Sequence, residues 1–365
     1  MKLDLYLIRR FLSSFLVVVS IMSCISLLLE VTELIRKYDI SQVHLVELLK
    51  ISLLNLPEMM YRILPLIILL STLAMYLNLS RSSEMVIIRA SSRSALRSLA
   101  GPVCTTSLIG IGSIFFLNPI IATTSKYHDS LIEQFTNSSK TITTVLNEGL
   151  WMRQNTINGQ IIIQAQKSDP TATFFNDLSM YGFDKQDRPI YRLNAISASL
   201  DSGFWNLKKV KYWNFNELSD AGAEGLDFPE FLISTDVTPT QIIKGFSPPN
   251  TITLWQLPAL ISRLDQAGFP SIKHKIWFQM ELANPLLLVS MVLIASAFAT
   301  RHARVTNVGI AILITLSLGF SIYFLKNFAS ILGQNLQIPI LVAAWIPPLT
   351  GILLSLGFLL HIEDG

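Results

Sequence analysis

The sequence is poor in charged residues and in cysteine. Only 15% of its 365 residues are charged, against roughly 25% in a typical soluble domain. So few charges argue against a soluble enzyme or a disordered chain. The net charge of +3 is too small to indicate a nucleic-acid partner without a local basic cluster. The two cysteines, Cys24 and Cys104, exclude a disulfide scaffold and a thiolate metal cage.

The sequence also lacks the short motifs that carry common chemistry. It contains no phosphate-binding loop of the G-x-x-x-x-G-K-[ST] type, no H-E-x-x-H and no G-x-S-x-G. The five histidines show no metal-ligand spacing; they are His44, His128, His274, His302 and His361. We therefore predict no catalytic residue, no metal, no cofactor and no nucleotide hydrolysis by this chain itself.

Long apolar runs are what the sequence does have. Of its residues, 51% are apolar, and six runs approach the about 20 residues that cross a bilayer as a helix. They are Phe11–Leu29, Ile63–Leu79, Leu99–Ala122, Leu282–Thr300, Val305–Leu325 and Ile338–Leu360. The pattern predicts a polytopic α-helical membrane protein, with three helices before a polar middle region and three after it.

The middle region reads as a β domain. Residues 140–270 hold 11 basic and 13 acidic residues, an ordinary balance for a soluble domain. Alternating stretches at Gly159–Gln166, Leu178–Asp184, Ile190–Leu200 and Asn206–Phe215 predict half-buried antiparallel strands. We expect a sandwich or jelly-roll-like fold. An apolar groove for acyl chains, strand addition to a partner and a simple solubilising cap all remain open as its role.

Basic residues in the short loops predict the orientation in the membrane. Nine of them fall on one side: Lys2, Arg9, Arg10, Arg81, Arg89, Arg93, Arg97, Arg301 and Arg304. We therefore expect both termini in the cytoplasm and the β domain on the outer side.

The segment Ser80–Ser94, between the second and third spans, predicts a short cytoplasmic helix. Ser82 or Ser83 can cap it, and Glu84 falls in its first turn, where an anion is favoured. Met85 and Ile88 contribute to an apolar face with Arg89 beside it. Such a helix can rest on lipid head groups or dock into a cytoplasmic motor subunit.

Ionisable residues gather at the predicted outer ends of the spans. They include Glu30, Glu33, Arg36, Lys37, Glu58, Arg62, Lys126, His128, Asp129, Glu133, Lys273, Lys275, Glu281 and Lys326. Glu281 is expected to precede the fourth span, and Lys326 to end the fifth. Interfacial anchoring explains such residues one by one. The alternative is a rim that binds phosphorylated lipid head groups, with Arg36, Lys37 and Lys126 as the cationic candidates.

Apolar side chains within the spans are candidates for contact with acyl chains. We select Phe15, Val19 and Met22 in the first span, and Phe320 and Phe324 in the fifth. Ordinary lipid-facing or bundle-core positions are the competing interpretation for each.

The stretch SRSSEMVIIRASSRS resembles the Ser-Glu-apolar-Arg-Ala-Ser-Gly segment of the LptF/LptG family, the permease subunits of the lipopolysaccharide export ABC transporter. Ser92 stands where the family pattern has its last glycine. The opening MKLDLYLIRRFLSSFL, the GLWMR at Gly149–Arg153 and two C-terminal blocks, NPLLLVSMVLIASAFATRHARVTNVG and GFSIYFLKNFASILGQNLQIPILVAAWIPP, are also similar to it. The opening and Gly149–Arg153 favour an LptG-like over an LptF-like member.

This resemblance implies an organisation and a set of partners. Residues 1–139 would hold three helices with a coupling helix at about 82–92, residues 140–270 a periplasmic β-jellyroll, and residues 271–365 three more helices. The chain would sit in the bacterial inner membrane and extract lipopolysaccharide. Its partners would be an LptF-like permease, an LptB-like ATPase dimer that Glu84 contacts, and LptC-like and LptA-like periplasmic β proteins. An LptF-like identity, a non-transporting scaffold and, least favoured, an intramembrane enzyme are the alternatives.

Overall fold

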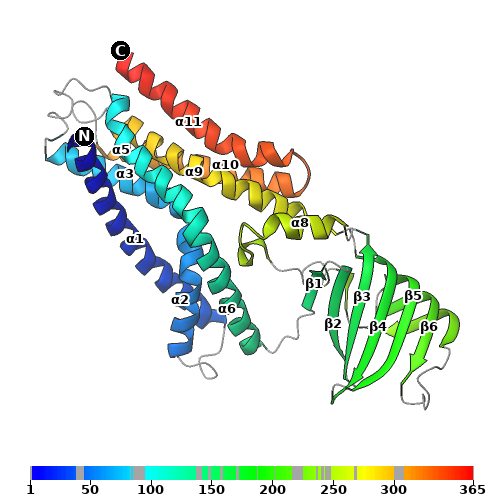
Figure 1. Cartoon of the computed structure of the whole chain (residues 1–365). Helices are drawn as coiled ribbons and strands as arrows, with labels where there is room; N and C mark the ends of the chain where they lie inside the picture. Colours follow the sequence, from blue (N-terminus) through cyan, green and yellow to red (C-terminus); the bar gives the residue numbers. More distant parts are fainter. Residues whose placement is uncertain are drawn as a thin grey trace. The chain divides into compact units, whose positions relative to one another are not determined.

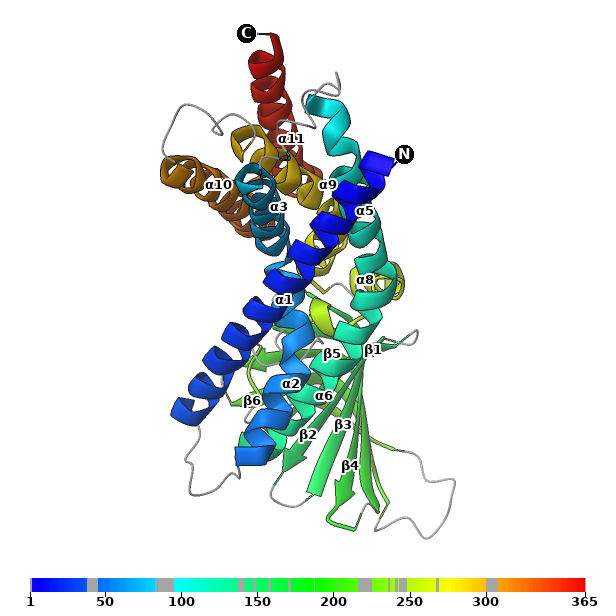
Figure 2. The ribbon, with the colours of Figure 1, turned by 90° about the vertical axis from the view of Figure 1, so that its left-hand side faces the viewer.

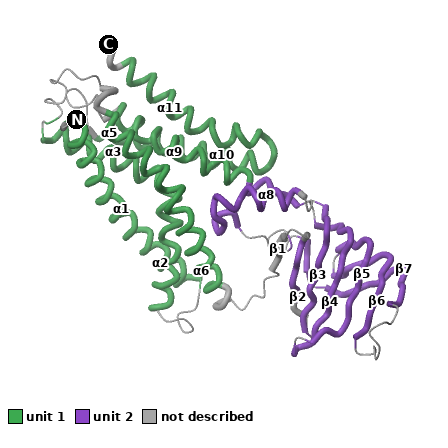
Figure 3. Tube along the Cα trace, in the orientation of Figure 1, with its two compact units in different colours: residues 1–132, 275–365 green, residues 133–274 purple. Residues whose placement is uncertain are grey.

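The computed structural model describes residues 2–37, 45–82, 84, 95–136, 142–146, 149–156, 159–169, 172–186, 188–201, 203–215, 225–235, 237–239, 242, 248–266, 269–299 and 308–364. The chain divides into two compact units (Figure 3). Unit 1 comprises Met1–Ile132 and Lys275–Gly365, and unit 2 comprises Glu133–His274. Each unit has its own hydrophobic core.

Unit 1 is built from long apolar helices (Figure 1). They are α1 (Lys2–Lys37), α2 (Leu45–Arg62), α3 (Leu64–Arg81), α5 (Ala95–Gly112), η1 (Ser113–Leu117), α6 (Asn118–Thr136), α9 (Ile272–Ala299), α10 (Val308–Gln334) and α11 (Ile340–Asp364). Six helical segments of the described chain are long and apolar enough to cross a membrane. Three precede unit 2 and three follow it, which confirms the predicted helical membrane protein with an inserted domain.

Two local irregularities shape these helices. The chain turns at Ile63 between α2 and α3, where Pro65 lies at the start of α3 and cannot donate a backbone hydrogen bond. The third span is continuous through α5, η1 and α6 but contains a π-helical turn. There the Asn118 N–H bonds the Ser113 carbonyl, five residues back. Such π turns are rare and are frequently found at functional sites.

The helices of unit 1 differ sharply in burial. Of the residues in the most apolar 18-residue stretch of α9, 72% are buried, whereas only 6% are buried in the corresponding stretch of α1. Close packing at the centre requires a small residue at Gly110, where a Cβ would lie 2.9 Å from the Cα of Pro285 in α9. By contrast α1 runs past α2, α3 and α5 along one side of the unit (Figure 2). It leaves Leu16, Val17, Leu28 and Leu29 exposed.

Unit 2 contains one antiparallel sheet of seven described strands in the order of the chain. The strands are β1 (Ile142–Leu146), β2 (Gly149–Thr156), β3 (Gly159–Ser168), β4 (Phe174–Asp184), β5 (Pro189–Asp201), β6 (Phe204–Asn214) and β7 (Leu226–Ser234). The four stretches with alternating polarity lie in β3, β4, β5 and β6. A tight turn after Asp201 joins β5 to β6, and Gly203 supplies its positive φ of 90°.

One face of this sheet carries the core of unit 2. Ile161, Ile163 and Ala165 alternate along β3 and are buried. The rings of Phe175 and Trp205 meet edge to face at 5.2 Å between centroids. Leu264 of α8 (Leu257–Gln266) belongs to the same core. In the described chain α8 therefore contributes to the core of unit 2.

Candidate lipid-contacting and cytoplasmic sites

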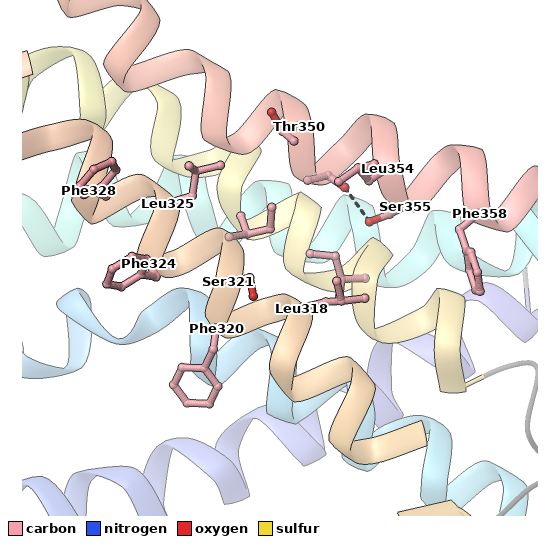
Figure 4. A pocket seen from close by; sticks show the side chains of 13 residues that line it. Leu318, Phe320, Ser321, Phe324, Leu325, Phe328, Thr350, Leu354, Ser355 and Phe358 are labelled. Atoms are coloured by element: carbon pink, nitrogen blue, oxygen red, sulfur yellow. Dashed lines mark hydrogen bonds between the residues drawn. The ribbon is translucent and has the colours of Figure 1, made fainter. Parts of the chain in front are cut away.

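An apolar groove lies among α9, α10 and α11 (Figure 4). Its volume is about 750 Å³, and its lining includes Phe320, Phe324 and Phe328 of α10 with Leu354 and Phe358 of α11. Phe320 and Phe324 were predicted from sequence to contact acyl chains, and both line this groove. Phe324 remains 70% exposed, so hydrocarbon placed in the groove can still remove much apolar surface from water.

The few hydroxyl groups in the groove do not make it polar. Ser321 donates to the Ser317 carbonyl at 2.7 Å, Thr350 to the Ile346 carbonyl at 2.8 Å, and Ser355 to the Gly351 carbonyl at 2.6 Å. Each hydroxyl is thus satisfied within its own helix. The groove therefore offers hydrocarbon and satisfied polar groups to an occupant, which suits an acyl chain.

The candidate acyl-chain residues of α1 lie elsewhere in unit 1. Phe15, Val19 and Met22 are half-buried, and the Phe15 ring stacks on Phe11 at 6.3 Å and packs against the helical core. None of the three belongs to the lining of the α9–α10–α11 groove. The structure thus does not bring the five candidate residues into one groove.

The predicted head-group residues are exposed side chains of α1 and α6. Arg36 and Lys37 occupy the last turn of α1, and Lys126 lies on α6. Glu30 accepts a hydrogen bond from the Asn55 amide at 2.8 Å and lies 4.0 Å from the His128 imidazole. These contacts bring α1, α2 and α6 together at the end of the unit where the three cations lie.

Glu58 links α2 to α6 at the same end. Its carboxylate accepts hydrogen bonds from Arg62 and from the buried Ser125, each at 2.8 Å. Arg62 lies four residues after Glu58, so the two side chains share one face of α2. Ser125 is an additional partner that the spacing of the residues did not reveal.

A buried polar cluster inside unit 1 was not foreseen. Tyr61 of α2 donates a hydrogen bond to the Glu281 carboxyl of α9, and the Asn284 amide donates to the Tyr61 hydroxyl at 3.2 Å. Glu281 is 5% exposed and Asn284 is 4% exposed. Lys326 of α10 lies near enough for its charge to interact with Glu281. Ionisable residues within membrane helices normally face the bundle interior and pair with one another.

The expected positions of Glu281 and Lys326 are wrong. Glu281 lies more than two turns inside α9 rather than before it, and Lys326 lies more than two turns before the end of α10. A run of apolar residues stops at the first charge, but a helix continues when that charge finds polar partners from other helices. Tyr61 supplies such a partner for Glu281.

Glu84, predicted to lie at the start of the cytoplasmic helix, contacts the first turns of α1. Its carboxylate accepts hydrogen bonds from the Tyr6 hydroxyl at 2.5 Å and the Arg10 guanidinium at 3.0 Å. The hydrogen bond from Tyr6 and the charge of Arg10 hold the pKa of Glu84 below its ordinary value. Met85, Ile88 and Arg89 lie outside the described residues, as does most of the predicted helix at 82–92.

The outer face of the sheet in unit 2 carries a second, more polar groove of about 740 Å³. Gln164, Asn194, Lys211 and Asp227 contribute to its lining. Within the described chain, no group of three or more His, Cys, Asp or Glu side chains is placed to hold a metal ion.

The described chain has six helices long and apolar enough to cross a membrane, three before and three after the β domain in sequence, which is the organisation of a multi-pass membrane protein. The sequence profile of the lipopolysaccharide export system permease LptF/LptG matches residues 5–361. The chain belongs to this family.

Two curated relatives are similar to part of the chain. They are the lipopolysaccharide export system permease proteins LptG of Escherichia coli K12 and of Escherichia coli O6:H1 strain CFT073. Each is 21% identical over 220 residues, which cover 59% of this chain and 58% of the relative. The similarity thus spans less than two thirds of these relatives.

Proposed function

We propose that this chain is a permease subunit of a lipopolysaccharide exporter. It extracts lipopolysaccharide from the outer leaflet of the inner membrane and passes it to a periplasmic bridge, while a separate cytoplasmic ATPase supplies the energy. The family match over residues 5–361 carries this proposal. The apolar groove of α9, α10 and α11 supports it, because burial of acyl chains releases about 25 cal/mol per Å² of apolar surface.

The exposed apolar face of α1 supports a second membrane subunit. An apolar helix surface in a membrane is covered by lipid or by another helix, and α1 is the least buried of the six spans. An LptF-like permease is the proposed neighbour. An LptB-like ATPase dimer on the cytoplasmic side and LptC-like and LptA-like β proteins in the periplasm complete the proposed complex.

Affinity purification of the tagged chain from its own membrane tests this assembly. We expect a second permease, two ATPase copies per complex and bound lipopolysaccharide. A non-transporting scaffold predicts the β-domain partners without a stoichiometric ATPase pair. Recovery of that second composition would refute the transporter proposal.

An LptG-like role is preferred to the LptF-like alternative. The opening residues and Gly149–Arg153 favour it, and the two similar relatives both carry the LptG name. Complementation separates the roles: the chain is expressed in cells depleted of LptG or of LptF, together with its native partners. Growth only after LptF depletion would assign it to the LptF-like role.

The proposed orientation places both termini in the cytoplasm and unit 2 in the periplasm. Single cysteines at Asp201 in unit 2 and at His361 near the C-terminus report it, after Cys24 and Cys104 are replaced by serine. A membrane-impermeant maleimide added to spheroplasts should label position 201 and spare position 361. The reverse labelling would invert the topology.

Arg36, Lys37 and Lys126 are proposed to contact the phosphorylated head group. All three are exposed cations on α1 and α6, the two helices that the Glu30 and His128 contact joins, and guanidinium and ammonium groups bind phosphate well. Photo-crosslinkers at Arg36 and Lys126 should label lipopolysaccharide in the complex. Labelling no stronger than at Leu353, an exposed position of α11, would contradict the assignment.

A further inference from the structure

Tyr6, Arg10 and Glu84 form a closed ring of hydrogen bonds. Tyr6 donates to one carboxylate oxygen of Glu84 at 2.5 Å, and the Nη2 of Arg10 donates to the other oxygen at 3.0 Å. The Nε of Arg10 donates to the Tyr6 hydroxyl at 2.7 Å. Tyr6 and Arg10 lie four residues apart, on one face of α1. Two residues of α1 thereby hold a carboxylate that lies 78 positions away in the sequence.

The same end of α1 is firmly packed. Leu7 and Phe11, next to the two polar residues, are 2% and 0% exposed. The backbone of α5 also approaches closely, because a Cβ on Gly101 would lie 3.2 Å from the Asp4 carbonyl oxygen. The middle of α1 is different: Leu16 and Leu28 are 64% and 65% exposed.

This distribution of contacts would let α1 move as one rigid helix when its N-terminal end is displaced. Its 36 residues extend about 54 Å at 1.5 Å per residue. A displacement applied at the packed, Glu84-bound end would be carried along this one continuous helix to the end where Glu30 contacts α2 and α6. Glu84 is one of the described residues of the segment proposed to face the ATPase.

We propose that Tyr6 and Arg10 are positioning residues that bind the Glu84 carboxylate and pass movement of the ATPase-facing segment to α1. This rests on the proposed function, because the movement originates in the ATPase cycle. The ring couples two parts of the chain that the backbone joins only through α2 and α3.

The ring itself is tested without the ATPase. Amide hydrogen exchange is measured on the purified chain in lipid nanodiscs, as native protein and as the variants Tyr6→Phe, Glu84→Gln and Arg9→Gln. Arg9→Gln is the matched control, because Arg9 is an exposed cation on the neighbouring face of α1. Loss of a hydrogen bond to a charged group should raise exchange at residues 4–11 roughly fivefold or more in the first two variants. Equal exchange in Tyr6→Phe and Arg9→Gln would overturn the proposal.

The transmission of movement is tested in the assembled complex. The measured quantity is lipid released per ATP hydrolysed. Tyr6→Phe and Glu84→Gln should lower it several-fold to the same extent, and the double variant should lower it no further, because both act through one contact. Arg10→Lys keeps the charge but not the two-point contact, so it should fall between native and Tyr6→Phe.

The outcomes separate the two proposals. A normal release ratio in Tyr6→Phe, together with raised exchange at residues 4–11, would overturn the relay while leaving the proposed function intact. Additive losses in the double variant would likewise overturn it. Lack of lipid release by the unmodified complex would instead contradict the proposed function, and the exchange result would still report whether the ring exists.

Discussion

Replacing Tyr61 by phenylalanine should destabilise unit 1, because it removes the hydroxyl group and its hydrogen bonds. The Tyr61 hydroxyl donates to the buried Glu281 carboxyl and accepts from the Asn284 amide. Phenylalanine keeps the ring and the packing around it. The variant therefore isolates the hydrogen bonds that join α2 to α9.

The expected loss follows from two contributions. Interhelical hydrogen bonds in membranes contribute about 0.6 kcal/mol each on average, so two of them give roughly 1 kcal/mol. The Glu281 carboxyl, 5% exposed, then loses its buried donor, which adds about 1–3 kcal/mol. The sum of about 2–4 kcal/mol corresponds to a roughly 30- to 900-fold shift of the unfolding equilibrium.

Reversible unfolding of the purified chain in mixed micelles measures this loss. Tyr323→Phe is the matched control, because that hydroxyl donates to the Arg62 carbonyl at 3.2 Å from a solvent-accessible position, and we expect under about 0.5 kcal/mol. Equal losses for Tyr61→Phe and Tyr323→Phe would refute the reasoning.

Three further predictions concern other sites. Trp205→Ala empties a fully buried site beside Phe175 and should cost about 3–5 kcal/mol in unfolding, whereas Trp255→Ala, 58% exposed, should cost far less. Phe324→Ala should weaken binding of a spin-labelled lipid roughly 10- to 150-fold, because one aromatic side chain contributes about 1.5–3 kcal/mol; an equal effect of Leu353→Ala would contradict a role for the groove. The lowered pKa of Glu84 favours its ionised form in the folded chain, so its contact with α1 is complete above the ordinary value of 4.5 and is lost as the pH falls through the lowered value. Hydrogen exchange at residues 4–11, corrected for intrinsic rates, should show this loss in native protein and not in Glu84→Gln.

The elements of this fold follow from local patterns. A helix that meets lipid needs a long apolar run, and a half-buried strand needs alternating side chains, so both are visible within about 20 residues of sequence. The spans and the strands β3 to β6 were predicted for this reason. Phe320 and Phe324 were chosen from sequence as candidates for contact with acyl chains, and both line the groove, although their contact with lipid stays a prediction.

The polar contacts between helices were not predictable in the same way. Tyr61 and Glu281 are 220 positions apart, and no periodicity in either helix relates them. Hydropathy also placed Glu281 outside its helix, because the sequence shows the charge and not the partner that makes it tolerable. The sequence did not indicate that Tyr6 binds Glu84 either, since a tyrosine near a membrane surface is ordinarily an interfacial anchor.

The π-helical turn at Ser113–Leu117 determines which way the side chains of α6 point around the axis of the third span. Each residue advances an α-helix by about 100°. Deleting one residue from this turn would leave the third span long enough to cross the membrane, yet it would swing α6 about a quarter turn around its own axis. Ser125 would then point away from Glu58, and His128 away from Glu30. Sequences that lack this one residue would have to place their polar partners on a different face of α6.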